Sequence, residues 1–282
     1  MDNQGHLLRL KNKLSSILSR ILLSQPRLRV HIIEEVKKKY FDLLNVEIEL
    51  SNGLKAPITY LDSLASFKEI FLDGCYSWIK PDLKCNRWLD IGCNNGFFTL
   101  NLVNQKLLGS TNENLSALLI DGDKRSQKST EKINRRYPDY VKTDFIWGVV
   151  GPKKPHVEFL NLEAMYAHIQ ETEDADTKGI SKDVVPVIQE EELLKRFAPP
   201  YDLVKIDIEG AEIDFLENYP TILRETTVLI IEWHSWNFRD ISMIEFEKRL
   251  GSKGFSIKRM SYLSWEDEGK TLSCADYFCE RI

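Results

Sequence analysis

The chain has 282 residues and a formal net charge of −5, and 43% of its residues are apolar. This length fits one large domain with an appendage, and the negative charge argues against a nucleic-acid partner. No apolar run reaches the ~18 residues that a membrane-spanning helix needs. The five cysteines lack the spacing of a disulfide framework or a zinc site. We therefore expect a cytoplasmic protein with reduced thiols and no stable membrane insertion.

The first forty residues are strongly basic. They hold nine Lys and Arg residues against three acidic ones, a net charge of +6, which leaves −11 for the rest of the chain. Apolar residues at helical spacing predict helices over residues 1–45, broken near Pro26. We expect such helices to pack on the core or to pair two subunits into a homo-oligomer. The alternatives are binding to a membrane surface, binding to another partner, or a targeting peptide. We assign residues 1–60 to this appendage and residues 61–282 to the main domain.

A small hairpin and a helix follow the basic segment. Apolar and acidic residues alternate over 46–50, Asn52-Gly53 is a strong turn signal, and a second short strand is predicted near 57–60. Residues 61–79 then have the pattern of a helix, which Pro81 ends.

Strands and helices alternate along the rest of the chain. Strands are predicted at 87–91, 115–121, 145–150, 157–160, 201–207, 228–233, 255–260 and 275–281, and helices at 97–107, 125–137, 211–219 and 242–251. Repeated strand–helix units indicate a doubly wound, mainly parallel α/β sheet, and the last two strands form an antiparallel pair across a polar loop at 266–270. Polar insertions interrupt this pattern at 109–114 and 170–183. The second is either a solvated linker or a flap over the substrate.

The most informative segment runs from Trp88 to Thr99. It is a short apolar strand with Asp90 near its end, a turn on Gly92 and Gly96, and the start of a helix. Doubly wound folds use this arrangement to hold a nucleotide-like ligand at the ends of parallel strands. The turn lacks the third glycine of the dinucleotide fingerprint, which allows close packing beside a pyrophosphate. The pattern therefore favours a nucleoside without phosphates.

Acidic residues end the neighbouring strands. Asp121 is placed to accept hydrogen bonds from both hydroxyls of a ribose, and the alternative is that it caps the helix beginning near Ser126. Asp90 can face an amino group or a sulfonium. Asp207 and Glu209 follow another buried strand. A nucleoside that has a ribose, an ammonium and no phosphate is S-adenosylmethionine.

Several segments belong to one pattern. They are Leu89-Asp-Ile-Gly-Cys-Asn-Asn-Gly96, Asp121-Gly-Asp123, Trp147-Gly-Val-Val-Gly151 with Val157-Glu-Phe159, Val184-Val-Pro-Val-Ile188 with Val204-Lys-Ile-Asp-Ile-Glu-Gly-Ala-Glu212, and Ile231-Glu-Trp-His234. Together these segments resemble the FkbM family of class I S-adenosylmethionine-dependent methyltransferases. The resemblance covers residues 65–260 and departs from the family pattern at Gly122, usually proline, and at Cys93, usually alanine.

The resemblance implies a Rossmann-like fold with a seven-stranded, mainly parallel sheet, and S-adenosylmethionine as cofactor. The cofactor-binding residues that we expect on this basis are Tyr76, Asp90, Gly92, Asn94, Asn95, Gly96, Asp121, Gly122, Trp147, Gly148, Val149 and Asp207.

A hydroxyl acceptor needs a general base within hydrogen-bond reach. His234 is the first candidate because imidazole titrates near neutral pH, and the alternative is a histidine that orients a loop. Asp207 and Glu209 are the other candidate catalytic residues. We expect Asp207 to stay ionised near the methionine part of the cofactor, whereas Glu209 contacts the acceptor or caps the helix starting at Gly210.

A carboxylate acceptor needs no base, since it is already ionised at neutral pH. It needs a cationic group instead, and the candidates are Lys205, His234, Arg239 and Lys153-Lys154. Asp207, Glu232 and His234 have the donor types of a divalent metal site. Glu232 and His234 share a face only if their strand continues that far, and we expect a metal-free site.

Three functions are compatible with these residues. The first is O-methylation of a small-molecule hydroxyl, such as that of a sugar or polyketide, in natural product biosynthesis, as the FkbM resemblance implies. The second is carboxyl methylation of a peptide or modified peptide. Trp147, Trp233 and Trp236 suit an aromatic acceptor without choosing between these. The third is a non-catalytic cofactor-binding module, which the acidic motifs at successive strand ends argue against.

Overall fold

The structure, a computed structural model, describes residues 46–79, 83–109, 113–160, 168–170, 182–236, 239–267 and 269–282. The helices predicted over residues 1–45 lie outside the described residues, as does most of the polar insertion at 170–183. Among the described residues, no helix combines the length and the apolar character needed to cross a membrane.

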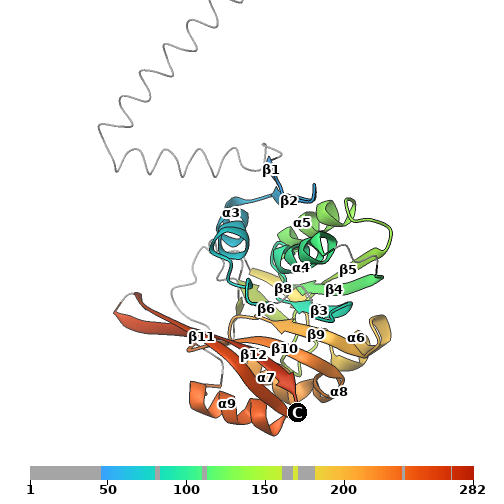
Figure 1. The fold of residues 1–282 in the computed structure, drawn as a ribbon. Coiled ribbons are helices and arrows are strands. Elements are labelled where there is room, and N and C mark those ends of the chain that lie inside the picture. Colours follow the sequence, from blue (N-terminus) through green and yellow to red (C-terminus); the bar gives the residue numbers. More distant parts are fainter. Residues whose placement is uncertain are drawn as a thin grey trace, which may run out of the picture.

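A seven-stranded sheet forms the centre of the molecule (Figure 1). Its order is β11-β12-β10-β9-β3-β4-β5, and β12 alone runs antiparallel to the others. The bounds are β3 Arg87–Ile91, β4 Leu115–Asp121, β5 Val141–Trp147, β9 Tyr201–Ile206, β10 Thr226–His234, β11 Phe255–Asp267 and β12 Lys270–Arg281. The predicted doubly wound, mainly parallel sheet of seven strands is confirmed.

Helices cover both faces of this sheet (Figure 1). One face carries α3 Leu61–Phe67, α4 Phe97–Leu108 and α5 Lys124–Asn134, and the other carries α6 Glu190–Arg196, α7 Glu212–Asn218, α8 Pro220–Arg224 and α9 Met243–Ser252. Side chains alternate along each strand, so β3 sends Trp88 into the core under α4 and sends Leu89 and Ile91 into the core under α7 and α9.

The predicted hairpin is confirmed as β1 Val46–Glu49 and β2 Lys55–Ile58, joined across the Asn52-Gly53 turn. Ala56 and Ile58 are buried in the same core as the residues of α4. The hairpin therefore packs on the main domain, while the domain boundary at residue 60 stays a prediction.

The single helix predicted over residues 61–79 is wrong. Helix α3 ends at Phe67, and a π-helical turn, η1 Lys68–Asp73, follows it. Gly74 has a φ of 67° and stops this turn in the left-handed conformation. Single π-turns inside helices are frequent at functional sites, and this one brings Glu69 to the site described below.

Strand β5, Val141–Trp147, is shifted from the predicted position at 145–150. Residue pairing with β4 runs from Val141 to Trp147, so Gly148 and Val149 leave the sheet. Val149 forms an isolated bridge with Val187 instead. The strand predicted at 157–160 is β6 His156–Leu160, in a separate antiparallel sheet with β7 His168–Gln170 and β8 Lys182–Pro186. The final pair is antiparallel as predicted, but it continues through the predicted loop to the pair Asp267–Lys270.

Candidate active site

Two cavities adjoin at the carboxyl ends of the central strands. The first opens at β3, β4 and β9, where the chain changes from one side of β3 to the other and where doubly wound folds bind ligands. It is lined by Tyr60, Ile91, Gly92, Asn94, Ile120, Asp121, Gly122, Asp123, Arg125, Ser126, Gly148, Val149, Val150, Phe159, Asp207, Ile208 and Glu209. Seven of the twelve expected cofactor-binding residues are in this set: Gly92, Asn94, Asp121, Gly122, Gly148, Val149 and Asp207.

The turn after β3 requires glycine at position 92. Gly92 has a φ of +70°, and a Cβ atom there would lie 1.6 Å from the backbone oxygen of Asp207. No neighbour can move far enough to make room, because the clash is with backbone. The turn of the first motif and the end of β9 are therefore in direct contact at the floor of the cavity.

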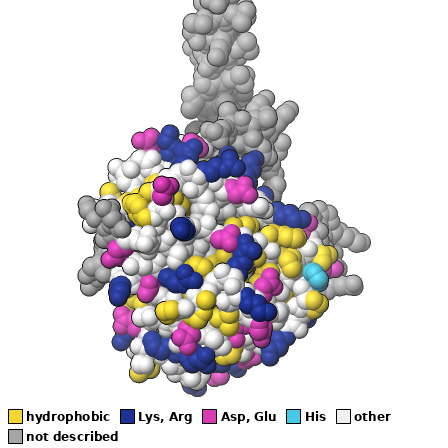
Figure 2. Space-filling view, turned by 90° about the vertical axis from the view of Figure 1, so that its right-hand side faces the viewer, with side chains coloured by type: hydrophobic (Ala, Val, Ile, Leu, Met, Phe, Trp, Pro, Cys, Tyr) yellow, Lys and Arg dark blue, Asp and Glu magenta, His cyan; other side chains and the backbone are white. Residues whose placement is uncertain are grey.

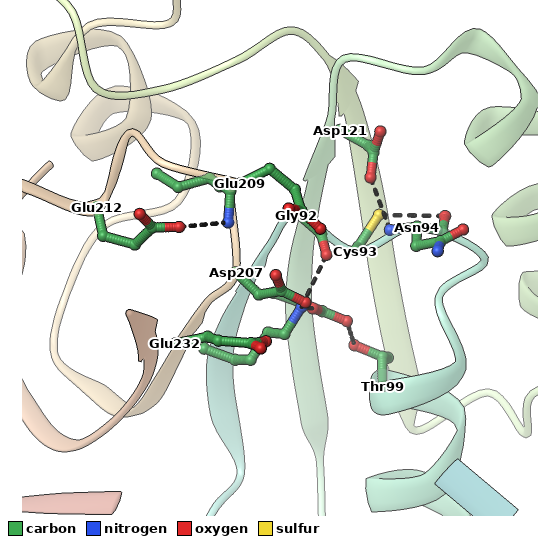
Figure 3. Close-up of polar contacts among 12 residues, drawn as sticks. Gly92, Cys93, Asn94, Thr99, Asp121, Asp207, Glu209, Glu212 and Glu232 are labelled. Atoms are coloured by element: carbon green, nitrogen blue, oxygen red, sulfur yellow. Dashed lines mark hydrogen bonds and ion pairs between the residues drawn. The ribbon is translucent and has the colours of Figure 1, made fainter. Parts of the chain in front are cut away.

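Asp121 lies at the end of β4, facing the first cavity (Figure 3). Its Oδ2 accepts a hydrogen bond from the backbone N–H of Asn94 at 2.6 Å, and its Oδ1 accepts one from that of Asp123 at 2.7 Å. Burial raises the pKa of Asp121 to about 7. The helix cap is Asp123, which accepts from the N–H of Arg125 at 2.8 Å, so Asp121 does not cap α5.

The wall of the first cavity includes residues that the sequence did not indicate. The hydroxyl of Tyr60 donates to Oδ1 of Asn94 at 2.6 Å, and the guanidinium of Arg125 lies 4.6 Å from the Tyr60 ring centre. Phe159 comes from the separate sheet, and a Cβ atom on Gly122 would lie 2.6 Å from its ring. A residue larger than glycine at position 122 would therefore displace this ring.

Four expected cofactor-binding residues line neither cavity. Asp90 is fully buried on the α4 side of the sheet and accepts from Oγ1 of Thr99 at 2.7 Å. Asn95 is fully buried and accepts from Oγ of Ser63. The other two also support the walls from behind: Gly96, which begins α4 with a φ of 76°, and Trp147, whose Nε1 donates to the backbone oxygen of Gly122.

The second cavity begins where the first ends, and Gly92, Asn94, Asp207 and Glu209 line both. Its remaining wall contains Ala65, Ser66, Glu69, Ile70, Cys75, Tyr76, Cys93, Phe98, Lys205, Glu232, His234, Trp236, Trp265, Cys274 and Asp276. Five of its lining residues carry carboxyl groups, and four have aromatic side chains. Tyr76 and Trp236 are here, whereas Trp233 packs in the core below.

Lys205 is held between carboxylates. Its Nζ is 3.0 Å from Oδ2 of Asp207, 2.8 Å from the backbone oxygen of Gly92 and 4.0 Å from Oδ1 of Asp90. Burial disfavours the charge, but Asp207 and Asp90 outweigh it and raise the pKa of Lys205. Burial also opposes ionisation of Asp207, but Lys205 and then His234 hold its pKa below the ordinary value. These contacts favour the carboxylate form of Asp207.

His234 is 2% exposed and surrounded by carboxyl groups. Its Nδ1 lies 3.0 Å from Oε1 of Glu212, and its Nε2 lies 3.6 Å from Glu232 and 3.7 Å from Glu209. Burial works against an imidazolium, but Glu212, Glu209 and Glu232 outweigh it and keep the pKa of His234 well above its ordinary value. A protonated ring cannot accept a proton, so these surroundings favour the positioning alternative over the predicted base.

Glu209 lies in a strained loop between the two cavities. Its φ is 54°, in the left-handed region that is rare for a residue with a side chain, and burial raises its pKa to about 8. It does not cap the next helix, because α7 begins at Glu212 with no side-chain cap. Glu212 instead accepts from the N–H groups of Ile208 and Gly210 and thereby fixes the loop (Figure 3).

The other basic candidates lie away from both cavities. Lys153 and Lys154 are exposed, and Arg239 pairs with Asp214, with Nε and Oδ1 separated by 2.9 Å. Glu69 and Asp276, which line the second cavity, escaped the sequence analysis because each comes from an element outside the recognised motifs.

Comparison with known proteins agrees with this arrangement. The model of the methyltransferase FkbM domain family matches residues 90–257, more than half of the chain. No curated protein matches the chain. Magnesium protoporphyrin IX methyltransferase from Synechocystis PCC 6803, solved with bound SAM, is 13% identical, with 78% of this chain and 81% of that chain covered and a TM-score of 0.43.

The TYW2 protein of M. jannaschii, solved in complex with AdoMet, is 11% identical, with 84% of this chain and 86% of that chain covered and a TM-score of 0.40. TM-scores this low support no inference about which acceptor this chain methylates. The family match carries the assignment, and it makes S-adenosylmethionine the methyl donor. The chain belongs to the FkbM methyltransferase domain family and is an S-adenosylmethionine-dependent methyltransferase.

Proposed function

We propose that this enzyme transfers the methyl group of S-adenosylmethionine, held in the first cavity, to a hydroxyl oxygen of a small molecule held in the second. The observation that carries the proposal is the shared wall of Gly92, Asn94, Asp207 and Glu209. A donor and an acceptor that meet at this wall are held for in-line displacement, and such positioning supplies much of the rate of a methyl transfer.

The residues of the first cavity fit an adenine nucleoside. Asp121 offers a carboxylate at the end of β4, where a ribose would bind, and Val149, Phe159 and Ile208 offer apolar surface for a purine ring. S-adenosylmethionine supplies an electrophilic methyl group on a sulfonium. The ionised carboxylate of Asp207 favours that positive charge at the junction of the cavities.

The charge of the second cavity supports a hydroxyl over a carboxylate acceptor. Five carboxyl groups line it: Glu69, Asp207, Glu209, Glu232 and Asp276. Among its described lining residues the basic ones are Lys205 and His234, and both already contact carboxyl groups. A peptide carboxylate would need a cationic partner that these two basic residues already give to carboxyl groups, whereas a neutral hydroxyl needs none. Tyr76, Phe98, Trp236 and Trp265 supply surface for a ring-containing natural product.

A nucleic-acid acceptor is not proposed. Recognition of a phosphate backbone needs a continuous basic surface. On the face in Figure 2, basic and acidic side chains are interspersed among apolar patches, and the second cavity itself is acidic.

Glu209 is the residue that we assign as proton acceptor in its ionised form, which its pKa of about 8 favours at mildly alkaline pH. It lines both cavities, and its Oε2 is buried with no hydrogen-bond donor among the described residues. General-base catalysis contributes roughly 10²–10⁴-fold to a rate. We expect Glu209→Gln to lower kcat by about 100-fold with little effect on S-adenosylmethionine affinity, and the exposed control Glu113→Gln to leave kcat unchanged.

The test of the acceptor uses S-adenosylmethionine with a labelled methyl group and a panel of sugar, polyketide and peptide acceptors. The proposal predicts label in methyl ethers, which resist mild alkali. Label recovered as alkali-labile methyl esters would contradict it and favour the carboxyl methyltransferase alternative.

Cofactor affinity should depend on pH through Asp121. The pKa of this buried carboxyl is about 7 in the free protein, and a ribose would bind the ionised form, so affinity should rise as pH increases through 7. We expect about tenfold tighter binding at pH 8 than at pH 6, measured by calorimetry. The same trend is expected with 5′-methylthioadenosine, which lacks the titrating amino group of the cofactor. Asp121→Asn should abolish the trend, and an unchanged trend in that variant would contradict the assignment.

A further inference from the structure

We propose that the second cavity binds a divalent metal cation through Asp207, Glu232 and His234. One ligand atom from each of these residues lies within 4.8 Å of the others. The donor set is two carboxylates and one imidazole, which suits divalent first-row ions such as Mn²⁺ and Co²⁺. The binding goes beyond the function proposed above and does not depend on which acceptor is methylated.

The backbone brings these three residues together. Strand β10 runs from Thr226 to His234, so the alternation of side chains continues through Glu232 and His234 and places both on one face. The parallel pairing of β10 with β9 ends at the pair Ile231–Ile206, so Asp207 emerges beside Glu232. The sequence places Glu232 and His234 on one face only if their strand continues to His234, and β10 does so.

The orientation of His234 fits a metal ligand. Its Nδ1 is 3.0 Å from Oε1 of Glu212, which is 1% exposed and is itself fixed by the N–H groups of Ile208 and Gly210. A metal-binding histidine commonly donates its other ring N–H to a carboxylate in this way, which fixes the tautomer and the ring plane. The opposite atom, Nε2, faces Glu232 and Glu209, and a bound cation would replace the proton that these carboxyl groups favour on it.

A separate observation concerns a buried carboxyl oxygen of Glu209 at this place. Oε2 of Glu209 is buried, has no hydrogen-bond donor among the described residues, and lies 3.7 Å from Nε2 of His234. A buried carboxylate oxygen without a donor is costly. Lys205 does not act as this donor, because its Nζ donates to Asp207 and to the backbone oxygen of Gly92. A cation between Asp207, Glu232 and His234 would lie next to this oxygen.

Three protein ligands leave coordination positions open for an acceptor hydroxyl. This catalytic role rests on the proposed function. The acceptor oxygen, polarised by the cation, would form its bond to the methyl carbon while the sulfur–methyl bond breaks and its electron pair stays on sulfur. The hydroxyl proton would pass to Glu209, so S-adenosylhomocysteine, the methylated acceptor and protonated Glu209 are the products of the step.

The experiment measures metal binding by the full chain without cofactor or acceptor. Chelator-treated protein is titrated with Mn²⁺, followed by electron paramagnetic resonance, and with Co²⁺, followed by visible absorption. We expect one equivalent of ion per chain. Glu232→Gln and Glu212→Gln should each weaken binding by about 10–100-fold. The matched control is Glu69→Gln, which removes a carboxylate from the same cavity outside the ligand set and should weaken binding far less than either of these variants.

Circular dichroism and thermal unfolding show whether each variant is folded, and Glu232→Asp replaces Glu232→Gln if the latter is not. Absence of stoichiometric binding by the folded wild-type chain would overturn the metal site. Equal weakening by Glu69→Gln and Glu232→Gln would also overturn it, since it would show diffuse attraction to an acidic cavity.

Methyl transfer is then assayed with and without chelator. Transfer that persists in the absence of bound metal would refute the catalytic role while leaving the methyltransferase assignment intact.

Discussion

Replacement of Gly92 by alanine is expected to destabilise the protein and to eliminate measurable cofactor binding. The added Cβ would lie 1.6 Å from the backbone oxygen of Asp207, and Gly92 has a φ of +70°. Left-handed strain and overpacking together predict a loss of about 2–5 kcal/mol in the free energy of unfolding. Any relief moves the turn or the end of β9, and both line the two cavities. Urea unfolding and calorimetry with S-adenosylmethionine measure the two effects.

The chain offers a matched control for this prediction. Gly53 has a φ of +84° with no atom within 4 Å of the position of an added Cβ. Gly53→Ala therefore tests left-handed strain alone, at about 1–2 kcal/mol, and should leave cofactor affinity unchanged. Equal losses of stability in the two variants would show that the close approach to Asp207 is not the cause.

Replacement of Lys205 by methionine is expected to be similarly damaging. The Lys205 side chain is 5% exposed, and its Nζ lies 3.0 Å from Asp207 and 4.0 Å from Asp90. Removing one partner of a buried ion pair leaves uncompensated charge and costs about 3–5 kcal/mol. Here two carboxyl groups lose their cation, so we expect a loss at the upper end of this range, measured by urea unfolding at pH 7.5.

Lys153→Met provides the comparison, because Lys153 is exposed and the same substitution there should change stability by less than about 0.5 kcal/mol. If Lys205→Met cost as little as the control, the two carboxyl groups would have to be stable without their lysine. The description of Lys205 as the cation that stabilises Asp207 and Asp90 would then be wrong.

The sequence predicted best where a local pattern determines the structure. The strands at 87–91 and 115–121 match β3 and β4 residue for residue, because each is an apolar run bounded by turn residues. The acidic strand end Asp121 faces the first cavity, and Asp207 faces both, since parallel strands end at one edge of the sheet. Asp90 departs from this rule because its side chain alternates to the α4 side and meets Thr99.

The cavity residues that the sequence did not indicate reach the site through contacts between segments that are distant in the chain. Tyr60 reaches the first cavity only because the β1–β2 hairpin packs beside α5, and Glu69 reaches the second only through the π-helical turn η1. Glu212 was recognised as part of a motif, yet its role could not be read from spacing, since its contact with His234 joins α7 to β10. The surroundings of His234 could not be predicted for the same reason, since the three carboxyl groups around the ring come from two different segments. The role of His234 as a base stays a prediction.

The most direct test of the account is calorimetric binding of S-adenosylmethionine and S-adenosylhomocysteine to the wild-type chain and to Asp121→Ala. The account predicts one equivalent of either ligand per wild-type chain. It also predicts an affinity about 10–100-fold weaker in the variant, because two charge-assisted hydrogen bonds to the ribose are lost. Folded wild-type protein that binds neither ligand, or equal affinity in Asp121→Ala, would contradict the placement of the cofactor in the first cavity.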